Sequence, residues 1–352
     1  MNAAPPLLVR LNAATNPVQP SETAQYRRYG LEPLQIEANE PDKILEHAAD
    51  CTVLFVVATA LPRPVVEGLQ RCRLISRLGN GTDKIAVDAA TEKGIVVSNA
   101  PLFCVPEMSD HIMALLLGLA RQLPQMERHF RAGTYGRARA EAVKQQRLSN
   151  QVLGIVGFGA TGPLVAQRAK AFGMRVVATR RNMTANRDAA DALGVEMVDL
   201  DSLLRIADFV SLQLPLTTET YHLIDQAALA KMKPGAYLIN TSRGALVDEE
   251  ALAQSLRQGH LAGAGIDTFE SIDIFAESTS PPDHPLQDLP NVILTPHVSA
   301  FSVQAAEDVA KDGVENAVAV LRGHLPPPAN IVNKGVQPRW SLAPWTPAVL
   351  AP

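Results

Sequence analysis

The stretch QVLGIVGFGATG, residues Gln151–Gly162, joins an apolar strand to a helix through three glycines. Gly157 permits a tight turn, Gly159 lets the backbone approach a pyrophosphate, and Gly162 lets helix and strand pack closely. The N-terminus of the helix adds free N–H groups that favour an anion. A second apolar strand follows over Arg175–Ala178. This order predicts a dinucleotide-binding βαβ unit, and a purely structural glycine turn is the alternative.

The end of that second strand distinguishes between the two nicotinamide dinucleotides. An NAD site usually places Asp or Glu there to bind the ribose 2′-hydroxyl. This chain instead has Arg180 and Arg181. Guanidinium groups suit a 2′-phosphate, because it is charged and its oxygens can accept two parallel hydrogen bonds. The sequence therefore favours NADP(H), with NAD(H) possible if both arginines are solvated surface residues.

Short apolar runs alternate with helical patterns along most of the chain, which predicts a parallel α/β fold. The runs do not alternate in polarity, as expected when both faces of a sheet are covered. A long helix is expected over Pro106–Arg121 and an irregular surface connection over Arg131–Asn150. The expected strands are Val53–Val57, Leu74–Arg77, Ile95–Ser98, Val152–Val156, Arg175–Ala178, Phe209–Gln213, Ala236–Asn240, Gly263–Asp267 and Val292–Thr295.

Composition excludes several classes of protein. The 352 residues favour two domains, and a net charge of −4 argues against a nucleic-acid binder. The three cysteines have no metal-type spacing and leave one unpaired, so we expect neither a disulfide framework nor a metal site. No apolar stretch is long enough for a membrane span, and no signal core follows the N-terminus. A cytoplasmic protein is expected.

Six segments together resemble the D-2-hydroxyacid dehydrogenase family, which includes phosphoglycerate dehydrogenase and glyoxylate/hydroxypyruvate reductase. They are Leu78–Asp83 (LGNGTD), Gly157–Gly162 (GFGATG), Leu212–Ile224 (LQLPLTTETYHLI), Asn240–Glu250 (NTSRGALVDEE), Leu261–Glu270 (LAGAGIDTFE) and Asn291–Ala300 (NVILTPHVSA). The resemblance implies two Rossmann-like doubly wound parallel-sheet domains. The nucleotide-binding domain, 104–296, is inserted into a flavodoxin-like substrate domain, 1–103 and 297–334, and a tail follows over 335–352. The family usually forms dimers.

The resemblance assigns the catalytic roles to Arg243 and His297. A guanidinium can clamp the carboxylate of a 2-oxo acid and polarise its ketone. An imidazole that titrates near neutrality can give a proton to the oxygen that develops charge, or take it back. The other histidines are expected to be structural or at the surface: His47, His111, His129, His222, His260, His284 and His324.

The family's third catalytic group, a glutamate that pairs with the histidine, has no direct match. Its position falls on Ile272, and the interval before His297 is longer than usual. An insertion can relocate the acid, and we place it at Glu277. Asp273 is the alternative, and a histidine without an acidic partner is another.

Cofactor and substrate contacts follow from the same resemblance. The expected cofactor-binding residues are Gly157, Gly159, Ala160, Thr161, Gly162, Arg180, Arg181, Pro215, Thr241 and Asp267. The expected substrate-binding loop is Leu78, Gly79, Asn80 and Gly81, whose backbone N–H groups would meet the substrate carboxylate together with Arg243. The glycines of this loop allow the backbone to turn inward.

The sequence thus predicts an enzyme that interconverts a small 2-oxo acid and a D-2-hydroxy acid by hydride transfer. A different class of function stays open. A dinucleotide-sensing protein, like the family's corepressor branch, would keep the same motifs with little or no turnover.

Overall fold

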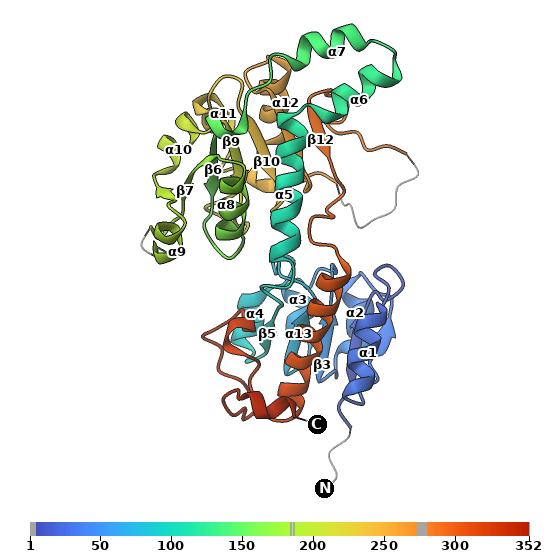
Figure 1. Ribbon diagram of the computed structural model, residues 1–352. Helices are drawn as coiled ribbons and strands as arrows, with labels where there is room; N and C mark the ends of the chain where they lie inside the picture. The colour runs from blue at the N-terminus through green and yellow to red at the C-terminus, as the bar shows by residue number, and fades with distance from the viewer. Residues whose placement is uncertain (1–4, 184, 186, 273–279, 352) are drawn as a thin grey trace. The chain divides into compact units, whose positions relative to one another are not determined.

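Figure 1 shows the computed structural model, which describes residues 5–183, 185, 187–272 and 280–351. The chain divides into two compact units. Unit 1 comprises Met1–Phe103 and Ser302–Pro352, and unit 2 comprises Cys104–Phe301. The chain thus returns to unit 1 after Phe301, later than the boundary at 296 that the sequence suggested.

Unit 1 contains a five-stranded parallel sheet in the order β2-β1-β3-β4-β5. This is the flavodoxin-like order, in which the strand order reverses beside β1. The strands are β1 (Leu8–Leu11), β2 (Leu34–Ile36), β3 (Val53–Val56), β4 (Leu74–Arg77) and β5 (Val96–Ser98). The helices are α1 (Pro20–Arg28), α2 (Pro41–Ala48), α3 (Arg63–Gly68), α4 (Val87–Glu92) and α13 (Val303–Leu321).

Each face of this sheet has its own core. In β3, Leu54 and Val56 belong to one cluster of buried residues, whereas Val53 and Phe55 belong to another. This alternation is the two-residue period of a strand that is covered on both sides. Helices α1 and α13 pack side by side on one face, as Figure 1 shows.

Unit 2 contains a seven-stranded parallel sheet in the order β12-β11-β10-β9-β6-β7-β8. The chain starts in the middle at β6, runs outward through β7 and β8, and returns to β9, so the order reverses between β6 and β9. Ligands of doubly wound sheets bind at such a switch point. The strands are β6 (Val152–Val156), β7 (Arg175–Thr179), β8 (Glu196–Met197), β9 (Phe209–Leu212), β10 (Tyr237–Asn240), β11 (Gly263–Ile266) and β12 (Val292–Leu294). The predicted fold class is confirmed.

Helices cover both faces of this sheet too. Leu153 and Ile155 of β6 pack in one cluster with α5 and α8, and Val156 packs in a second cluster with α10, α11 and α12. The helices are α5 (Val105–Ala120), α6 (Leu123–Arg131), α7 (Tyr135–Ala142), α8 (Thr161–Ala171), α9 (Arg187–Ala192), α10 (Leu200–Ile206), α11 (Gln226–Lys231) and α12 (Glu249–Arg257).

One expected irregular segment is partly helical. The stretch Arg131–Asn150 contains α7, so the expectation of a wholly irregular connection was wrong. Local pairs stabilise this short helix, because Glu141 accepts from Arg137 at 3.1 Å and contacts His129 at 3.0 Å. In the sequence these charged residues suggested an irregular loop, but in the structure they form ion pairs along the helix.

The C-terminal tail packs on unit 1. Val349 is buried, and Arg322 Nη1 donates to the carbonyls of Val349 at 2.6 Å and Ala351 at 2.7 Å. Within the described ranges, no helix is both long and apolar enough to cross a membrane.

Candidate active site

The candidate site lies at the carboxyl edge of the unit 2 sheet. All of the strand pairs there are parallel, so the loops that follow the strands emerge at one edge. Gly157 follows β6, Arg243 lies shortly after β10, Asp267 follows β11 and His297 lies shortly after β12. The sheet order β12-β11-β10 sets the loop of Asp267 between those of Arg243 and His297.

The glycine turn has the geometry that its sequence predicts. Gly157 has φ +100°, and a Cβ there would lie 2.7 Å from the carbonyl carbon of Gln213 and closer still to its oxygen. Only glycine fits such a position. At Gly159 an added Cβ would meet no atom of the chain, so the backbone there faces open space. The turn leads into α8, whose first residues are Thr161 and Gly162.

The two arginines after β7 have different surroundings. Arg180 is half-buried, and its Nη1 donates to the carbonyls of Phe158 at 2.8 Å and Ala185 at 3.0 Å. It therefore braces the glycine turn. Arg181 is exposed, and its charge helps the Thr217 hydroxyl to lower the pKa of the Glu219 carboxyl.

Two further predicted cofactor contacts lie at strand ends. Pro215 is exposed after β9, and its carbonyl accepts from the Thr220 hydroxyl at 2.8 Å. Thr241, directly after β10, is only 2 % exposed, and its hydroxyl oxygen has no hydrogen-bond partner among the described residues. Leaving a buried hydroxyl unpaired costs about 1–3 kcal/mol. The open backbone at Gly159 and this unpaired hydroxyl both fit a bound dinucleotide.

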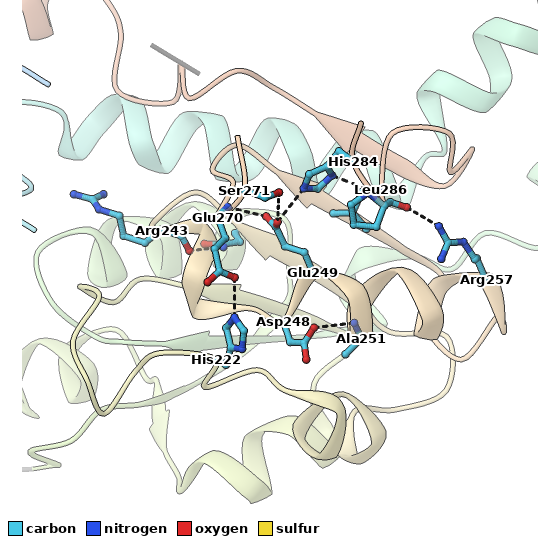
Figure 2. Close-up of polar contacts among 12 residues, drawn as sticks. His222, Arg243, Asp248, Glu249, Ala251, Arg257, Glu270, Ser271, His284 and Leu286 are labelled. Carbon is cyan, nitrogen blue, oxygen red and sulfur yellow. Dashed lines mark hydrogen bonds and ion pairs between the residues drawn. The ribbon is translucent and has the colours of Figure 1, made fainter. Parts of the chain in front are cut away.

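Arg243 is held at its backbone. Asn240 Nδ2 donates to the Arg243 carbonyl at 2.7 Å, and Arg243 Nη1 donates to the carbonyl of Ser242 at 2.7 Å. A Cβ at Gly244 would overlap the backbone of Phe269, so this loop and the segment after β11 touch directly. In Figure 2 the half-buried Arg243 side chain projects away from the polar residues around Glu249.

A buried carboxylate ties the segment after β11 to α12. Glu249 accepts from the backbone N–H of Glu270 at 3.0 Å and from His284 Nε2 at 2.9 Å (Figure 2). The Leu286 N–H donates to His284 Nδ1 at 3.3 Å, so His284 carries its proton on Nε2. Glu270 itself pairs with His222 at 2.7 Å.

The sequence missed the contact between Glu249 and His284, because the two residues lie far apart in the chain. His284 was expected to be structural, without a partner being named. Both acids predicted as alternatives for the partner of His297, Glu277 and Asp273, lie outside the described residues.

The turn that carries His297 is fixed by Asp267. This carboxylate is fully buried; its Oδ1 accepts from the Thr295 hydroxyl at 2.5 Å and from the Val298 N–H at 3.0 Å, and its Oδ2 accepts from the Ser299 N–H at 3.1 Å. His297 has φ +55°, which non-glycine residues seldom adopt. Its half-buried side chain is thus placed by a turn that three hydrogen bonds to one carboxylate hold.

The predicted substrate loop belongs to unit 1. The N–H groups of Leu78 and Gly79 already donate, to the carbonyls of Val56 at 2.8 Å and Arg77 at 2.9 Å. Arg77 donates to the carbonyl of Gly81 at 2.9 Å and to that of Leu78. A guanidinium that the sequence did not single out therefore shapes this loop and makes it favourable for an anion.

Comparison with known proteins agrees with this geometry. The family model described as D-isomer specific 2-hydroxyacid dehydrogenase, NAD binding domain, matches residues 113–299, which is more than half of the chain. The chain belongs to the D-isomer specific 2-hydroxyacid dehydrogenase family. It is therefore an oxidoreductase of the nicotinamide-dinucleotide-dependent 2-hydroxyacid dehydrogenase class, as the sequence predicted.

Individual members of the family resemble the chain along most of its length. It is 39 % identical over 295 residues to a glyoxylate reductase of Korarchaeum cryptofilum, which covers 83 % of this chain and 86 % of that one. It is 38 % identical over 312 residues to a D-3-phosphoglycerate dehydrogenase of Mycobacterium tuberculosis, covering 88 % of this chain but only 56 % of that longer protein. The D-lactate dehydrogenase of Aquifex aeolicus, solved with NAD and lactic acid, superimposes with a TM-score of 0.82 at 26 % identity and covers 93 % of this chain and 99 % of that one.

Among the residues that the structure describes, no group of three or more His, Cys, Asp or Glu side chains could hold a metal ion.

Proposed function

We propose that this dehydrogenase interconverts a small 2-oxo acid and the corresponding D-2-hydroxy acid, with Arg243 and His297 touching the substrate. The His297 turn supports this most. Asp267 holds that turn at the same sheet edge as the Arg243 loop, two strands away. Neighbouring strands lie ~5 Å apart, so the two loops start roughly 10 Å from each other. Long side chains on both loops can reach one small molecule across that span.

The proposed roles follow from the charge that develops during reduction. Arg243 binds the carboxylate of the acid and polarises its ketone, and a bidentate guanidinium suits both tasks. His297 gives its proton to the carbonyl oxygen as that oxygen becomes an alkoxide, and takes it back in the reverse direction. A bound reduced dinucleotide would supply the hydride.

The cofactor would be held along the carboxyl edge. In this proposal the turn from Gly157 to Gly162, with Ala160 and Thr161, surrounds the pyrophosphate, and Pro215 lies on the adenosine side. The Thr241 hydroxyl would gain the hydrogen bond that it lacks. Asp267 already accepts three hydrogen bonds from the turn that carries His297. It would contact the nicotinamide side of the cofactor only through its remaining lone pairs.

We infer a preference for NADP(H), with NAD(H) as the lesser substrate. The exposed Arg181 is the side chain that would meet a 2′-phosphate, because Arg180 is committed to the carbonyls of Phe158 and Ala185. A guanidinium is a strong partner for a dianionic phosphate.

The partner acid of His297 stays a proposal at Glu277, with Asp273 as its alternative. In unit 1 we propose that the N–H groups of Asn80 and Gly81 bind a carboxylate, because those of Leu78 and Gly79 already have acceptors. The Asn80 side chain and carbonyl are themselves bonded to Asn99 Nδ2, at 3.2 Å and 2.7 Å, which fixes the turn.

We also propose a homodimer through the α6–α7 hairpin. Neither helix contributes a buried residue to its own chain. Leu123, Phe130 and Tyr135 are exposed on it, with Phe130 at 70 %, and the rings of Phe130 and Tyr135 lie 5.7 Å apart. An exposed apolar patch of this kind suits a second copy of the chain. A cytoplasmic location is consistent with three cysteines that are all free thiols.

The test is NADPH oxidation, followed at its near-ultraviolet absorbance band, with glyoxylate, hydroxypyruvate, pyruvate and bulkier 2-oxo acids. Turnover of at least one acid, faster with NADPH than with NADH, is expected. Tight dinucleotide binding with no turnover of any acid would instead indicate a dinucleotide sensor.

A further inference from the structure

Helix α5 presents a histidine to the turn that holds His297. His111 Nε2 lies 3.1 Å from the Thr295 hydroxyl and 3.7 Å from Asp267 Oδ1. Its side chain is 21 % exposed, and one turn earlier on the same helix Met108 Sδ accepts from the Ser299 hydroxyl at 3.1 Å. Helix α5 therefore contacts both ends of the segment from Thr295 to Ser299.

The direction of the hydrogen bonds follows from counting protons. The Thr295 hydroxyl has one proton, and the Asp267 carboxylate can only accept. At a distance of 2.5 Å, the Thr295 hydroxyl must therefore donate its hydrogen bond to Asp267 Oδ1. Its oxygen is left as the acceptor for His111, so His111 carries a proton on Nε2. Nε2 of His111 carries a proton both in this neutral tautomer and in the imidazolium ion. The hydrogen bonds from His111 to Thr295 and from Thr295 to Asp267 therefore keep the same donors and acceptors in both states.

These hydrogen bonds stabilise the strained backbone at His297. A left-handed conformation at a non-glycine residue persists only where the surroundings over-determine it. At His297 the surroundings are the Thr295 hydroxyl and the N–H groups of Val298 and Ser299, all converging on Asp267. His111 fixes the Thr295 hydroxyl in the orientation that this arrangement needs.

We propose that His111 is a positioning residue for the acid/base histidine, acting on His297 through Thr295 and Asp267. The proposal rests on the proposed function of His297. Nothing in the sequence around His111 indicated this role, because its partners lie more than 150 positions away in the chain. Removing its N–H donor lets the Thr295 hydroxyl rotate and the imidazole at 297 leave the geometry for proton transfer. A misplacement of ~1 Å can cost up to ~100-fold in rate.

The experiment compares three variants in steady-state reduction of the best 2-oxo acid. His111→Leu removes the donor, His111→Gln keeps an N–H donor, and Thr295→Val removes the hydroxyl at nearly constant volume. We expect His111→Leu to lower kcat about tenfold, with KM and the Kd for the dinucleotide within about twofold of wild type. His111→Gln should recover most of that loss.

A double-mutant cycle decides whether His111 acts through Thr295. If it does, the variant with both His111→Leu and Thr295→Val loses no more kcat than the worse single variant. Multiplied losses, or a His111→Leu enzyme that melts earlier but keeps its kcat, would overturn the proposal.

A readout without turnover separates this proposal from the proposed function. If the wild-type protein reduces no 2-oxo acid, the proposed function fails, and the NMR resonances of the His297 imidazole still test the positioning. These resonances, assigned by their loss in His297→Asn, should move in His111→Leu and return in His111→Gln. Resonances that stay unchanged in His111→Leu would overturn the role of His111.

Discussion

The glycine turn after β6 allows a crossed prediction, because its first two glycines are needed for different reasons. At Gly157 an added Cβ would lie 2.7 Å from the carbonyl carbon of Gln213 and from Leu214 Cδ2, at φ +100°. The conformation alone costs an L-residue about 1–2 kcal/mol, and moving a packed backbone adds about 1–2 kcal/mol. We expect Gly157→Ala to lower the free energy of unfolding by ~3 kcal/mol. For a unit of this size that is a fall of roughly 6–12 °C in Tm.

Gly159→Ala is the matched control. Its Cβ meets nothing in the chain, so the Tm should stay within a few degrees of wild type. In the proposed site the same methyl group occupies the space through which a pyrophosphate approaches the backbone. The Kd for NADPH should therefore rise tenfold or more.

The assays are thermal unfolding by circular dichroism and calorimetric titration with NADPH. A Gly157→Ala variant that melts like wild type would contradict the steric role of Gly157. A Gly159→Ala variant that binds NADPH as tightly as wild type would contradict the cofactor-binding role of Gly159.

Four further substitutions test other parts of the site and the fold. His297→Asn should lower kcat about 10²–10⁴-fold in the NADPH oxidation assay with the dinucleotide Kd nearly unchanged, and an unchanged kcat would remove His297 from the chemistry. Arg181→Asp should reduce the ratio of NADPH to NADH affinity at least tenfold, and identical ratios before and after this change would contradict the role of Arg181. Arg180→Gln should weaken the binding of both dinucleotides, because Arg180 stabilises the glycine turn. Burial, and then the charge of Glu315, raises the pKa of Asp312 to about 6. Because that folded-state value exceeds the ordinary one of ~3.9, folding stability is lost as pH rises through about 6. Asp312→Asn should therefore stabilise the protein by ~1 kcal/mol at pH 7, a figure reduced for partial solvation, and should have no effect on stability below pH ~4. Urea titrations at the two pH values measure the gain in the free energy of unfolding, and equal gains at both would contradict the raised pKa of Asp312.

The sequence predicted six of the seven strands in the unit 2 sheet, because most of them are apolar runs between turn residues and are buried on both faces. It missed the two-residue strand β8, which is only partly buried. It failed at the first strand. β1 contains Arg10, which reads as a surface residue but is 1 % exposed and pairs with buried Glu22 at 2.8 Å. A charge neutralised by a partner twelve residues away is invisible to a local hydropathy pattern.

The candidate site divides in the same way. The glycine turn, Arg243 and His297 were predicted, since each belongs to a local motif at a strand end. The sequence did not predict the contacts of His111 with Thr295 and of Glu249 with His284, because each joins segments that only the folded sheet brings together. The segment in which Glu277 was placed lies outside the described residues, so its role stays a prediction.

In the proposed reaction, Arg243 and His297 support hydride transfer to the carbonyl carbon of a 2-oxo acid. A direct measurement uses NADPH with deuterium in both positions at C4 of its dihydropyridine ring, with mass spectrometry and chiral analysis of the product. We expect one deuterium on C2 of a D-2-hydroxy acid. Dinucleotide that binds but leaves every 2-oxo acid unlabelled, or label in the L-product, would contradict it.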